Sequence, residues 1–243
     1  MRMLVTRPEP DVADTAGRLE ALEIEAVPCP LLTFECLPTS LPEARGFAAL
    51  AVTSANALRA LDERGVLGAY RDIKVFTVGD RTADKARAYG CTDVQSAGGS
   101  FGDLVDMLAH AGIDGPVFYP SGRDLAGDLA KSLAPFGVMV IAAQVYAMIP
   151  VAALPLEVRE GLVDGSIGAA LFYSRRTAET FVKLASDGLG REAHLRLGML
   201  CLSEAVAEPL IDAHFVRVSL ADYPSEEAMM GLALSFARDQ NAS

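Results

Sequence analysis

The stretch LAVTSANA, residues 50–57, has a counterpart in ALFYSRRT, residues 170–177, and this pair indicates how the 243-residue chain folds. In both, a short apolar run leads into a serine, Ser54 or Ser174, and then into the residues of a helix. A short apolar run is typical of a buried strand, and serine commonly begins a helix. Each stretch therefore predicts a strand, a turn and a helix, the repeating unit of an α/β protein.

The similarity between the two parts of the chain extends beyond this pair. Three more pairs of stretches are similar, namely 4–22 with 117–133, 78–83 with 202–207, and 99–104 with 224–229. The chain thus contains two copies of one pattern. Short strand-like runs alternate with helical spacing of apolar residues, at 3–6, 26–28, 49–53, 74–78, 117–119, 138–142, 169–173 and 197–202. This alternation predicts parallel sheets covered by helices.

Two arrangements of the copies are possible. Each copy could fold alone, or the first strand and helix could pack with the last part of the chain and leave the middle as an inserted domain. We favour the second, because segments 26–37 and 138–151 are long, extended and interrupted by prolines, as expected of strands passing between two bodies. The predicted domains are residues 1–37 with 151–243, and residues 38–150, with a cleft between two lobes and the connecting segments as its hinge.

Composition excludes some classes of function. The 21 Lys and Arg against 32 Asp and Glu give a net charge of −11, and 51% of the residues are hydrophobic, which excludes a disordered chain. The acidic balance argues against nucleic acid or an anionic membrane as partner. Most of the basic residues are Arg, which binds carboxylate or phosphate through paired hydrogen bonds, although a codon preference for Arg would explain the same ratio.

Cysteine spacing and hydropathy predict a cytoplasmic protein without a membrane partner. The four cysteines form no C-x-x-C pair, as in proteins that keep reduced thiols. Residues 1–8 form a strand and turn pattern without the apolar core of a signal peptide. The longest apolar run, 138–153, is interrupted by Gln144 and Pro150 and is too short to span a bilayer.

Candidate binding residues gather where the predicted strands end. Ligands of open α/β sheets bind at the carboxyl ends of strands, facing helix N-termini. Hydroxyl, amide and guanidinium side chains occur at these positions, at Arg7, Ser54, Asn56, Thr82, Arg123, Ser174, Arg175 and Ser203. With Arg81 and Arg176, they predict a surface for several carboxylates or phosphates, with positive potential confined to the cleft. The alternative is that the hydroxyl groups cap helices and the arginines are solvated.

Other chemistry finds little support in the sequence. The three histidines lack the spacing of metal ligands, and there is neither a phosphate-binding G-x-x-x-x-G-K-S/T loop nor a G-x-S-x-G turn, so we expect no metal. The remaining candidate is Tyr146, in the second connecting segment. It is either a core tyrosine with its hydroxyl group satisfied, or a residue on the hinge that donates a proton to a substrate.

Taken together, these residues resemble the uroporphyrinogen-III synthase family over nearly the whole chain. The resemblance is carried by motifs that follow one another in order, V-T-R-P at 5–8, T-S-x-N-A at 53–57, V-G-x-x-T-A-x-x-A-x-x-x-G at 78–90, a helix-opening Ser100, the connector Tyr146 and P-S-x-x-A at 224–228. The chain departs from the family at 203–207, where Val206 supplies no threonine hydroxyl, and at Met148, where a threonine often follows the tyrosine. Ser174 is followed by two arginines in a turn that usually carries less charge.

The resemblance implies two flavodoxin-like α/β lobes with parallel sheets, joined by a two-stranded β hinge, with a discontinuous first domain and no cofactor. It implies a lyase of haem biosynthesis, which closes linear hydroxymethylbilane into uroporphyrinogen III with loss of water and inversion of the last pyrrole. A monomer is the simplest expectation for the oligomeric state. Tyr146 is then the acid, with Thr82, Ser54 and Ser174 near the substrate. The rival hypothesis is a non-catalytic two-lobed protein that closes on a polycarboxylate or phosphate ligand.

Overall fold

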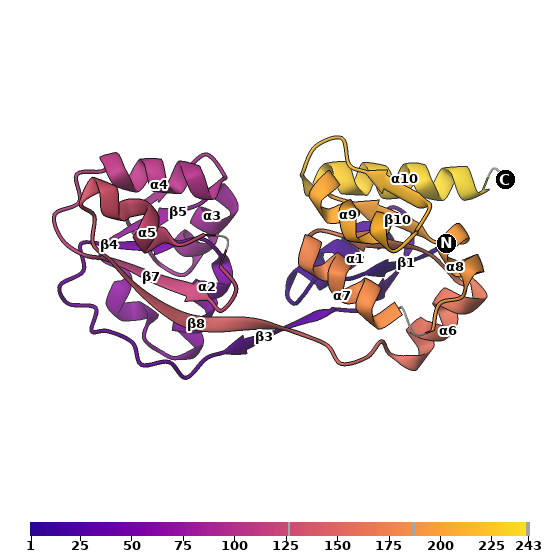
Figure 1. The fold of residues 1–243 in the computed structure, drawn as a ribbon, viewed down its shortest axis with the longest axis horizontal. Helices are drawn as coiled ribbons and strands as arrows, with labels where there is room; N and C mark the ends of the chain where they lie inside the picture. The colour runs from indigo at the N-terminus through magenta and orange to yellow at the C-terminus, as the bar shows by residue number, and fades with distance from the viewer. Residues whose placement is uncertain (126, 186–187, 242–243) are drawn as a thin grey trace. The chain divides into compact units, whose positions relative to one another are not determined.

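The chain forms two compact units in a computed structural model, which describes residues 1–125, 127–185 and 188–241 (Figure 1). Unit 1 consists of Met1–Thr33 with Ile149–Ser243, and unit 2 of Phe34–Met148. Both boundaries fall inside strands, β3 (Leu32–Cys36) and β8 (Val140–Pro150), so the chain passes from one unit to the other in extended conformation.

Unit 1 is built on a five-stranded sheet with the strand order β11-β10-β9-β1-β2, in which every neighbouring pair is parallel. The strands are β1 (Arg2–Val5), β2 (Glu25–Pro28), β9 (Ile167–Phe172), β10 (Gly198–Cys201) and β11 (Arg217–Leu220). The three central strands are almost wholly buried, as expected when helices cover both faces of a parallel sheet. Because β1 pairs with β9, the sheet combines the two ends of the chain.

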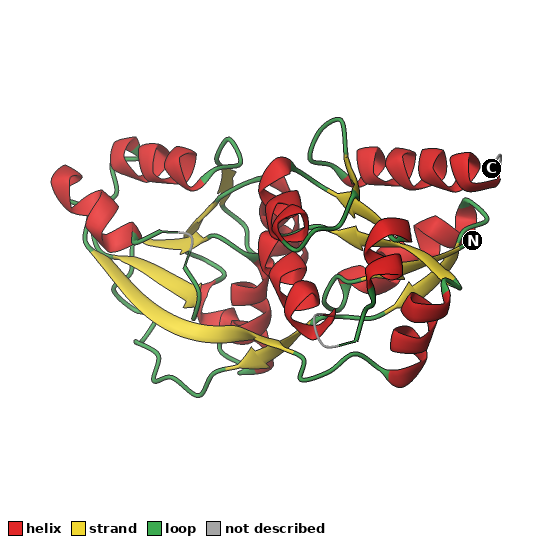
Figure 2. Cartoon of the chain, turned by 45° about the vertical axis from the view of Figure 1, so that its right-hand side comes forward, coloured by secondary structure: helices red, strands yellow, loops and turns green. Residues whose placement is uncertain are grey.

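Helices cover both faces of this sheet (Figure 2). One face carries α1 (Asp11–Ala21) and α10 (Glu226–Asn241), which bury Val12, Leu19 and Phe236 in one core cluster. The other face carries α6 (Leu156–Asp164), α7 (Arg175–Ala185) and α9 (Glu204–Asp212), which bury Leu162, Phe181 and Leu210 in a second cluster. The short helix α8 (Arg191–Arg196) precedes β10.

Unit 2 is built on a six-stranded sheet with the order β3-β8-β7-β4-β5-β6. Its other strands are β4 (Ala49–Val52), β5 (Lys74–Thr77), β6 (Val94–Ser96) and β7 (Val117–Gly122). Helices α2 (Ala55–Glu63) and α3 (Asp80–Ala88) contribute to the core cluster on one face, and α4 (Phe101–His110) and α5 (Leu129–Leu133) to that on the other. Two short 3₁₀ helices, η1 (Leu67–Tyr70) and η2 (Ala134–Phe136), complete the unit.

The two sheets share one strand order. If the five strands of unit 1 are renumbered from 1 to 5 in chain order, their order across the sheet is 2-1-3-4-5. This is the flavodoxin-like order. Unit 2 shows the same arrangement if β7 is taken as its first strand, because β7 lies between β8 and β4 just as β1 lies between β2 and β9. The α/β fold with parallel sheets and a sheet that combines the first and last parts of the chain is therefore confirmed.

The passage between the units is a pair of neighbouring strands. β3 lies beside β8 in the sheet of unit 2, where the amide of Leu37 donates to the carbonyl of Val145 at 2.8 Å. On the side of unit 1, the amide of Val151 donates to the carbonyl of Leu31 at 3.0 Å. The two segments expected to connect the domains thus pair with each other.

Some local predictions need correction. The strand expected at 138–142 is only the start of the longer β8, and β6 and β11 were not predicted. Leu125, which has helical spacing with Leu129 and Leu133, lies outside α5 with 47% of its surface exposed. The helix begins later because the side chain of Asp128 accepts a hydrogen bond from the amide of Lys131 and caps it.

Candidate active site

The predicted site residues fall into two groups, one at the carboxyl edge of each sheet. In unit 1, Arg7, Ser174 with Arg175, and Ser203 follow the adjacent strands β1, β9 and β10. In unit 2, the same edge carries residues that follow β4, β5 and β7 and one residue of β8, namely Ser54, Asn56, Thr82, Arg123 and Tyr146. Parallel strands bring these positions to one edge, so the topology gathers each group within its own unit.

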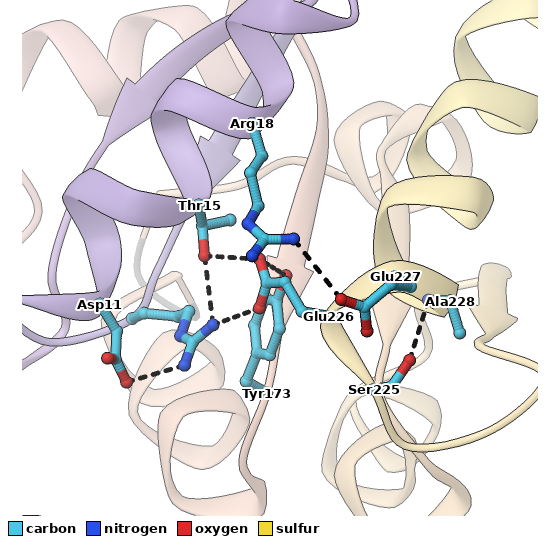
Figure 3. Close-up of polar contacts among 9 residues, drawn as sticks. Asp11, Thr15, Arg18, Tyr173, Ser225, Glu226, Glu227 and Ala228 are labelled. Atoms are coloured by element: carbon cyan, nitrogen blue, oxygen red, sulfur yellow. Dashed lines mark hydrogen bonds and ion pairs between the residues drawn. The ribbon is translucent and has the colours of Figure 1, made fainter. Parts of the chain in front are cut away.

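Arg7 lies in a buried network at the edge of the first sheet. Figure 3 shows the residues around it, among them Asp11, Thr15, Tyr173 and Glu226. Its guanidinium forms ion pairs with Asp11 at 2.7 Å and Glu226 at 2.5 Å, and donates to the hydroxyl of Thr15 at 3.2 Å. The guanidinium also lies over the ring of Tyr173, 4.2 Å from its centroid. Two carboxylates thus surround one cation, so this part of the edge carries no net positive charge.

Glu226 joins three elements in this network. It accepts hydrogen bonds from the hydroxyl groups of Thr15 at 2.9 Å and Tyr173 at 3.1 Å, in addition to its ion pair with Arg7. Burial, followed by the negative charge of Glu226, raises the pKa of Tyr173 well above its ordinary value. Tyr173 therefore keeps its proton and acts here as a hydrogen-bond donor, and the network holds the start of α10 against α1 and the end of β9.

The other residues of the first group differ in what their side chains do. Ser174 accepts from the amide of Thr177 at 3.2 Å and shares a hydrogen bond with its hydroxyl group, so it caps α7. Arg175 is half exposed and forms ion pairs with Glu179 at 2.9 Å and with Glu208. Ser203 occupies the N-cap position of α9 without a side-chain capping hydrogen bond, which leaves its hydroxyl group at the first turn of that helix.

The second group combines capping residues with residues at the sheet edge. Ser54 caps α2 by accepting from the amide of Asn56 at 3.2 Å, and the amide side chain of Asn56 lies 3.4 Å from the sulfur of Met148. Thr82 is buried in the first turn of α3, a helix whose N-cap, Gly79, provides no side chain. Arg123 directly follows β7 and is exposed.

Tyr146 lies on β8 at the same edge, opposite Gly122, the last residue of β7. Its ring is half buried and stacks on Phe34, with ring centroids 5.9 Å apart and an angle of 18° between the planes. Neither Gly122 nor Phe34 was among the predicted site residues. The sequence signal for Gly122 is its place in the P-S-G-R stretch at 120–123, where a predicted strand ends.

Three further observations concern other kinds of site. Within the ranges that the structure describes, no cluster of three or more His, Cys, Asp or Glu residues is arranged to hold a metal ion. No helix in these ranges combines the length and apolarity needed to cross a membrane. A cavity of about 730 Å³ lies beside α6 and α7, and none of the predicted site residues lines it.

The chain is similar to a known family over most of its length. A family model described as Uroporphyrinogen-III synthase HemD matches residues 13–231. A comparison with curated proteins found no match.

Solved structures with the same fold carry related descriptions. A uroporphyrinogen-III synthetase from Helicobacter pylori matches 97% of this chain and 100% of its own, with a TM-score of 0.67 and 20% identity. A mutant uroporphyrinogen III synthase from Thermus thermophilus matches 100% of both chains, with a TM-score of 0.60 and 20% identity. At this level of identity the likeness establishes the fold.

Proposed function

Because the chain belongs to the uroporphyrinogen-III synthase HemD family, we propose that it closes hydroxymethylbilane into uroporphyrinogen III, with loss of water and inversion of the last pyrrole. The observation that carries the proposal is the family match over residues 13–231. The reaction is that of a hydro-lyase in tetrapyrrole biosynthesis, and we propose that it proceeds without a cofactor in a cytoplasmic monomer.

Tyr146 is the proposed acid. Loss of the hydroxyl of the terminal hydroxymethyl group as water requires a proton at its oxygen. It leaves a cation on the methylene carbon, which then bonds to the pyrrole carbon at the other end of the chain. The Tyr146 hydroxyl is the donor that we assign, because the ring stands at the end of β7, where ligands of parallel sheets bind. The cation forms readily, so the larger task of the protein is to hold the linear chain folded and to exclude water.

The carboxylates of the substrate need hydrogen-bond donors other than the arginines that already form two ion pairs within the protein. Arg7 and Arg175 each pair with two carboxylates, so we propose that they support the site rather than bind the substrate. The proposed binding groups are Arg123, the Ser203 hydroxyl and the first-turn amides of α3 and α9, with Ser54, Asn56, Thr82 and Ser174 beside them. This distribution explains how a chain with a net charge of −11 could bind a polyanion, since a few oriented donors act locally.

A product assay tests the proposed function. Hydroxymethylbilane incubated with the protein should give the type III porphyrin after oxidation, whereas hydroxymethylbilane alone should give type I. If only type I forms while the protein binds hydroxymethylbilane in a calorimeter, the rival binding protein is the correct interpretation. Monomeric mass in solution by light scattering would test the proposed oligomeric state.

The variant Tyr146→Phe tests the proposed acid. We expect kcat to fall about tenfold, less than the 100-fold or more common for a positioned acid, because the hydroxyl of the hydroxymethyl group leaves readily as water. KM should change little, since the phenyl ring keeps its stacking on Phe34. Tyr89→Phe is the matched control, because Tyr89 follows the C-terminal end of α3, whereas the proposed site lies at the first turn of that helix. The kcat of this variant should stay at the wild-type value. Full activity of Tyr146→Phe would remove Tyr146 from the mechanism.

A further inference from the structure

We propose that Gly122 and Phe34 are positioning residues, which fix the ring of Tyr146 from its two sides. The inference rests on the proposed function of Tyr146 as the acid, and it is drawn from contacts within unit 2. A tyrosine side chain can adopt several rotamers. A group that must donate a proton in a defined direction has to be held in one of them before the substrate binds.

Gly122 provides the space in which the ring lies. A Cβ atom at this position would lie 2.8 Å from Cζ of Tyr146, closer than Cβ atoms approach other atoms in proteins, and 3.0 Å from Oη and 3.1 Å from Cε2, which are also tight contacts. The backbone of Gly122 is not in the left-handed region that favours glycine. The ring of Tyr146 is therefore the reason why glycine is needed at this position. We call the space in which the ring lies the slot, and the hydrogen atoms of Gly122 form one wall of it.

An irregularity in the pairing of β7 with β8 directs Tyr146 to this wall. Ser121 pairs with Gln144, but the next residue, Gly122, pairs with Tyr146, so one residue of β8 is passed over. That residue, Val145, is fully buried in the core. The amide of Arg123 donates to the carbonyl of Tyr146 at 2.9 Å and secures the shifted register. Bulges of this kind re-aim a side chain at the end of a strand.

Phe34 contacts the ring from β3, the strand on the other side of β8 from β7, and is itself supported. Its ring stacks on Tyr146, and the guanidinium of Arg59 lies over it, 4.1 Å from its centroid. Arg59 is held in turn by an ion pair with Glu63 at 2.8 Å. The side chains thus form a stack that runs from α2 through β3 to β8. Removal of Phe34 would open one side of the slot without introducing any new atom.

The first test observes the ring directly. Protein labelled with ¹³Cζ-tyrosine carries six tyrosines, and the variant Tyr146→Phe identifies the signal of Tyr146. We expect Gly122→Ala and Phe34→Leu each to shift or broaden that signal without substrate. Gly68→Ala is the control, because a Cβ atom there meets nothing within 4 Å, and it should leave the signal in place. An unchanged Tyr146 signal in both test variants would overturn the inference.

The second test asks whether the two residues act through the hydroxyl group of Tyr146. Gly122→Ala and Phe34→Leu should lower kcat about tenfold with little change in KM, and neither should lower it further when Tyr146 is already Phe. If Gly122→Ala or Phe34→Leu lowers kcat by the same factor in the Tyr146→Phe protein as in the wild type, the inference is wrong. Full activity of Tyr146→Phe would instead refute the proposed acid, and the ¹³C signal would still decide whether Gly122 and Phe34 hold the ring.

Discussion

At the scale of single residues, the cation of Arg7 has the clearest energetic consequence. Its side chain is 8% exposed, and those of its partners Asp11 and Glu226 are 27% and 20% exposed. Replacement by Met would leave two carboxylates facing each other without a cation. We expect Arg7→Met to lower the free energy of unfolding by about 3 kcal/mol, as for other buried pairs that lose one partner. Urea denaturation followed by circular dichroism measures the change.

Arg87→Met is the matched control for this prediction. Arg87 pairs with Asp84 on the surface of α3, where both side chains are more than half exposed, and such pairs contribute little to stability. The unfolding midpoint of this variant should stay close to that of the wild type. Equal losses in the two variants would show that the buried network does not stabilise the fold as we describe.

Buried thiols make the free energy of unfolding depend on pH in the alkaline range. Burial raises the pKa of Cys29 from 9.0 to about 11 and that of Cys201 from 9.0 to about 12. The folded protein keeps these protons above pH 9, whereas the unfolded chain releases them. Stability should therefore be complete below about pH 9 and decline as pH rises towards 11 and 12, by about 1.4 kcal/mol per pH unit for each thiol.

Urea midpoints between pH 8 and pH 11 measure this decline. The variant Cys201→Ala removes one of the buried thiols, so its stability should fall less steeply with pH than that of the wild type. A parallel decline in both proteins would assign the pH dependence to other groups.

At the scale of elements, the approach of α10 to the first sheet is set by a glycine in β10. A Cβ atom at Gly198 would lie 2.2 Å from the ring of Phe236 on α10, and Arg217 covers that ring from the neighbouring strand. Gly198→Ala should therefore force the helix away from the sheet and lower the free energy of unfolding by about 3 kcal/mol.

The same substitution within α10 should have the opposite sign. A Cβ atom at Gly231 meets nothing within 4 Å, and alanine is the better helix former, so Gly231→Ala should raise the free energy of unfolding by about 0.5–1 kcal/mol. Thermal melts of the two variants compare the predictions directly. A Gly198→Ala protein as stable as the wild type would mean that the contact between Gly198 and Phe236 does not set the approach of α10 to the sheet.

The elements differ in how far the sequence predicts them. Central strands such as β4 and β10 are continuous apolar runs, because both of their faces are buried, and they could be predicted. The edge strands β6 and β11 are short and only partly buried, so their residues show no apolar run. The slot around Tyr146 could not be predicted either, because Gly122 and Phe34 meet it only through the pairing of strands distant in sequence.

For the candidate site, the sequence predicts position better than role. Sheet topology brings the predicted residues to the strand ends, which follows from the α/β alternation alone. The engagement of Arg7 by Asp11 and Glu226 depends on α1 and the start of α10 meeting at the end of β1. No local pattern in the sequence encodes that meeting, so the ion pairs of Arg7 with Asp11 and Glu226 could not be predicted.

At the scale of the whole molecule, each unit has its own hydrophobic core. Among the described residues, the clusters of unit 2 contain only residues from Phe34–Met148, and those of unit 1 only residues from the two flanking segments. We expect a fragment of residues 34–148 to unfold cooperatively on its own in urea, because its core needs nothing from outside. A fragment without a cooperative transition would show that unit 2 depends on unit 1.

Unit 1 allows the complementary experiment. Leu31 and Val151 are joined by a backbone hydrogen bond, so a short glycine linker between them could replace the whole of unit 2. We expect the shortened chain to fold, and its midpoint to lie close to that of unit 1 in the intact protein. Loss of folding would mean that β3 and β8 stabilise unit 1 beyond the residues it contains.

The pairing of β1 with β9 places both ends of the chain in one unit. Tension applied between the first and last residues would therefore be borne by the first sheet, while the inserted unit, entered and left through adjacent strands, would carry none until that sheet opened. A threading protease or translocating pore that pulls on the chain from either side of these two units thus reaches unit 1 before unit 2, which is shielded from the pull because it is inserted within unit 1.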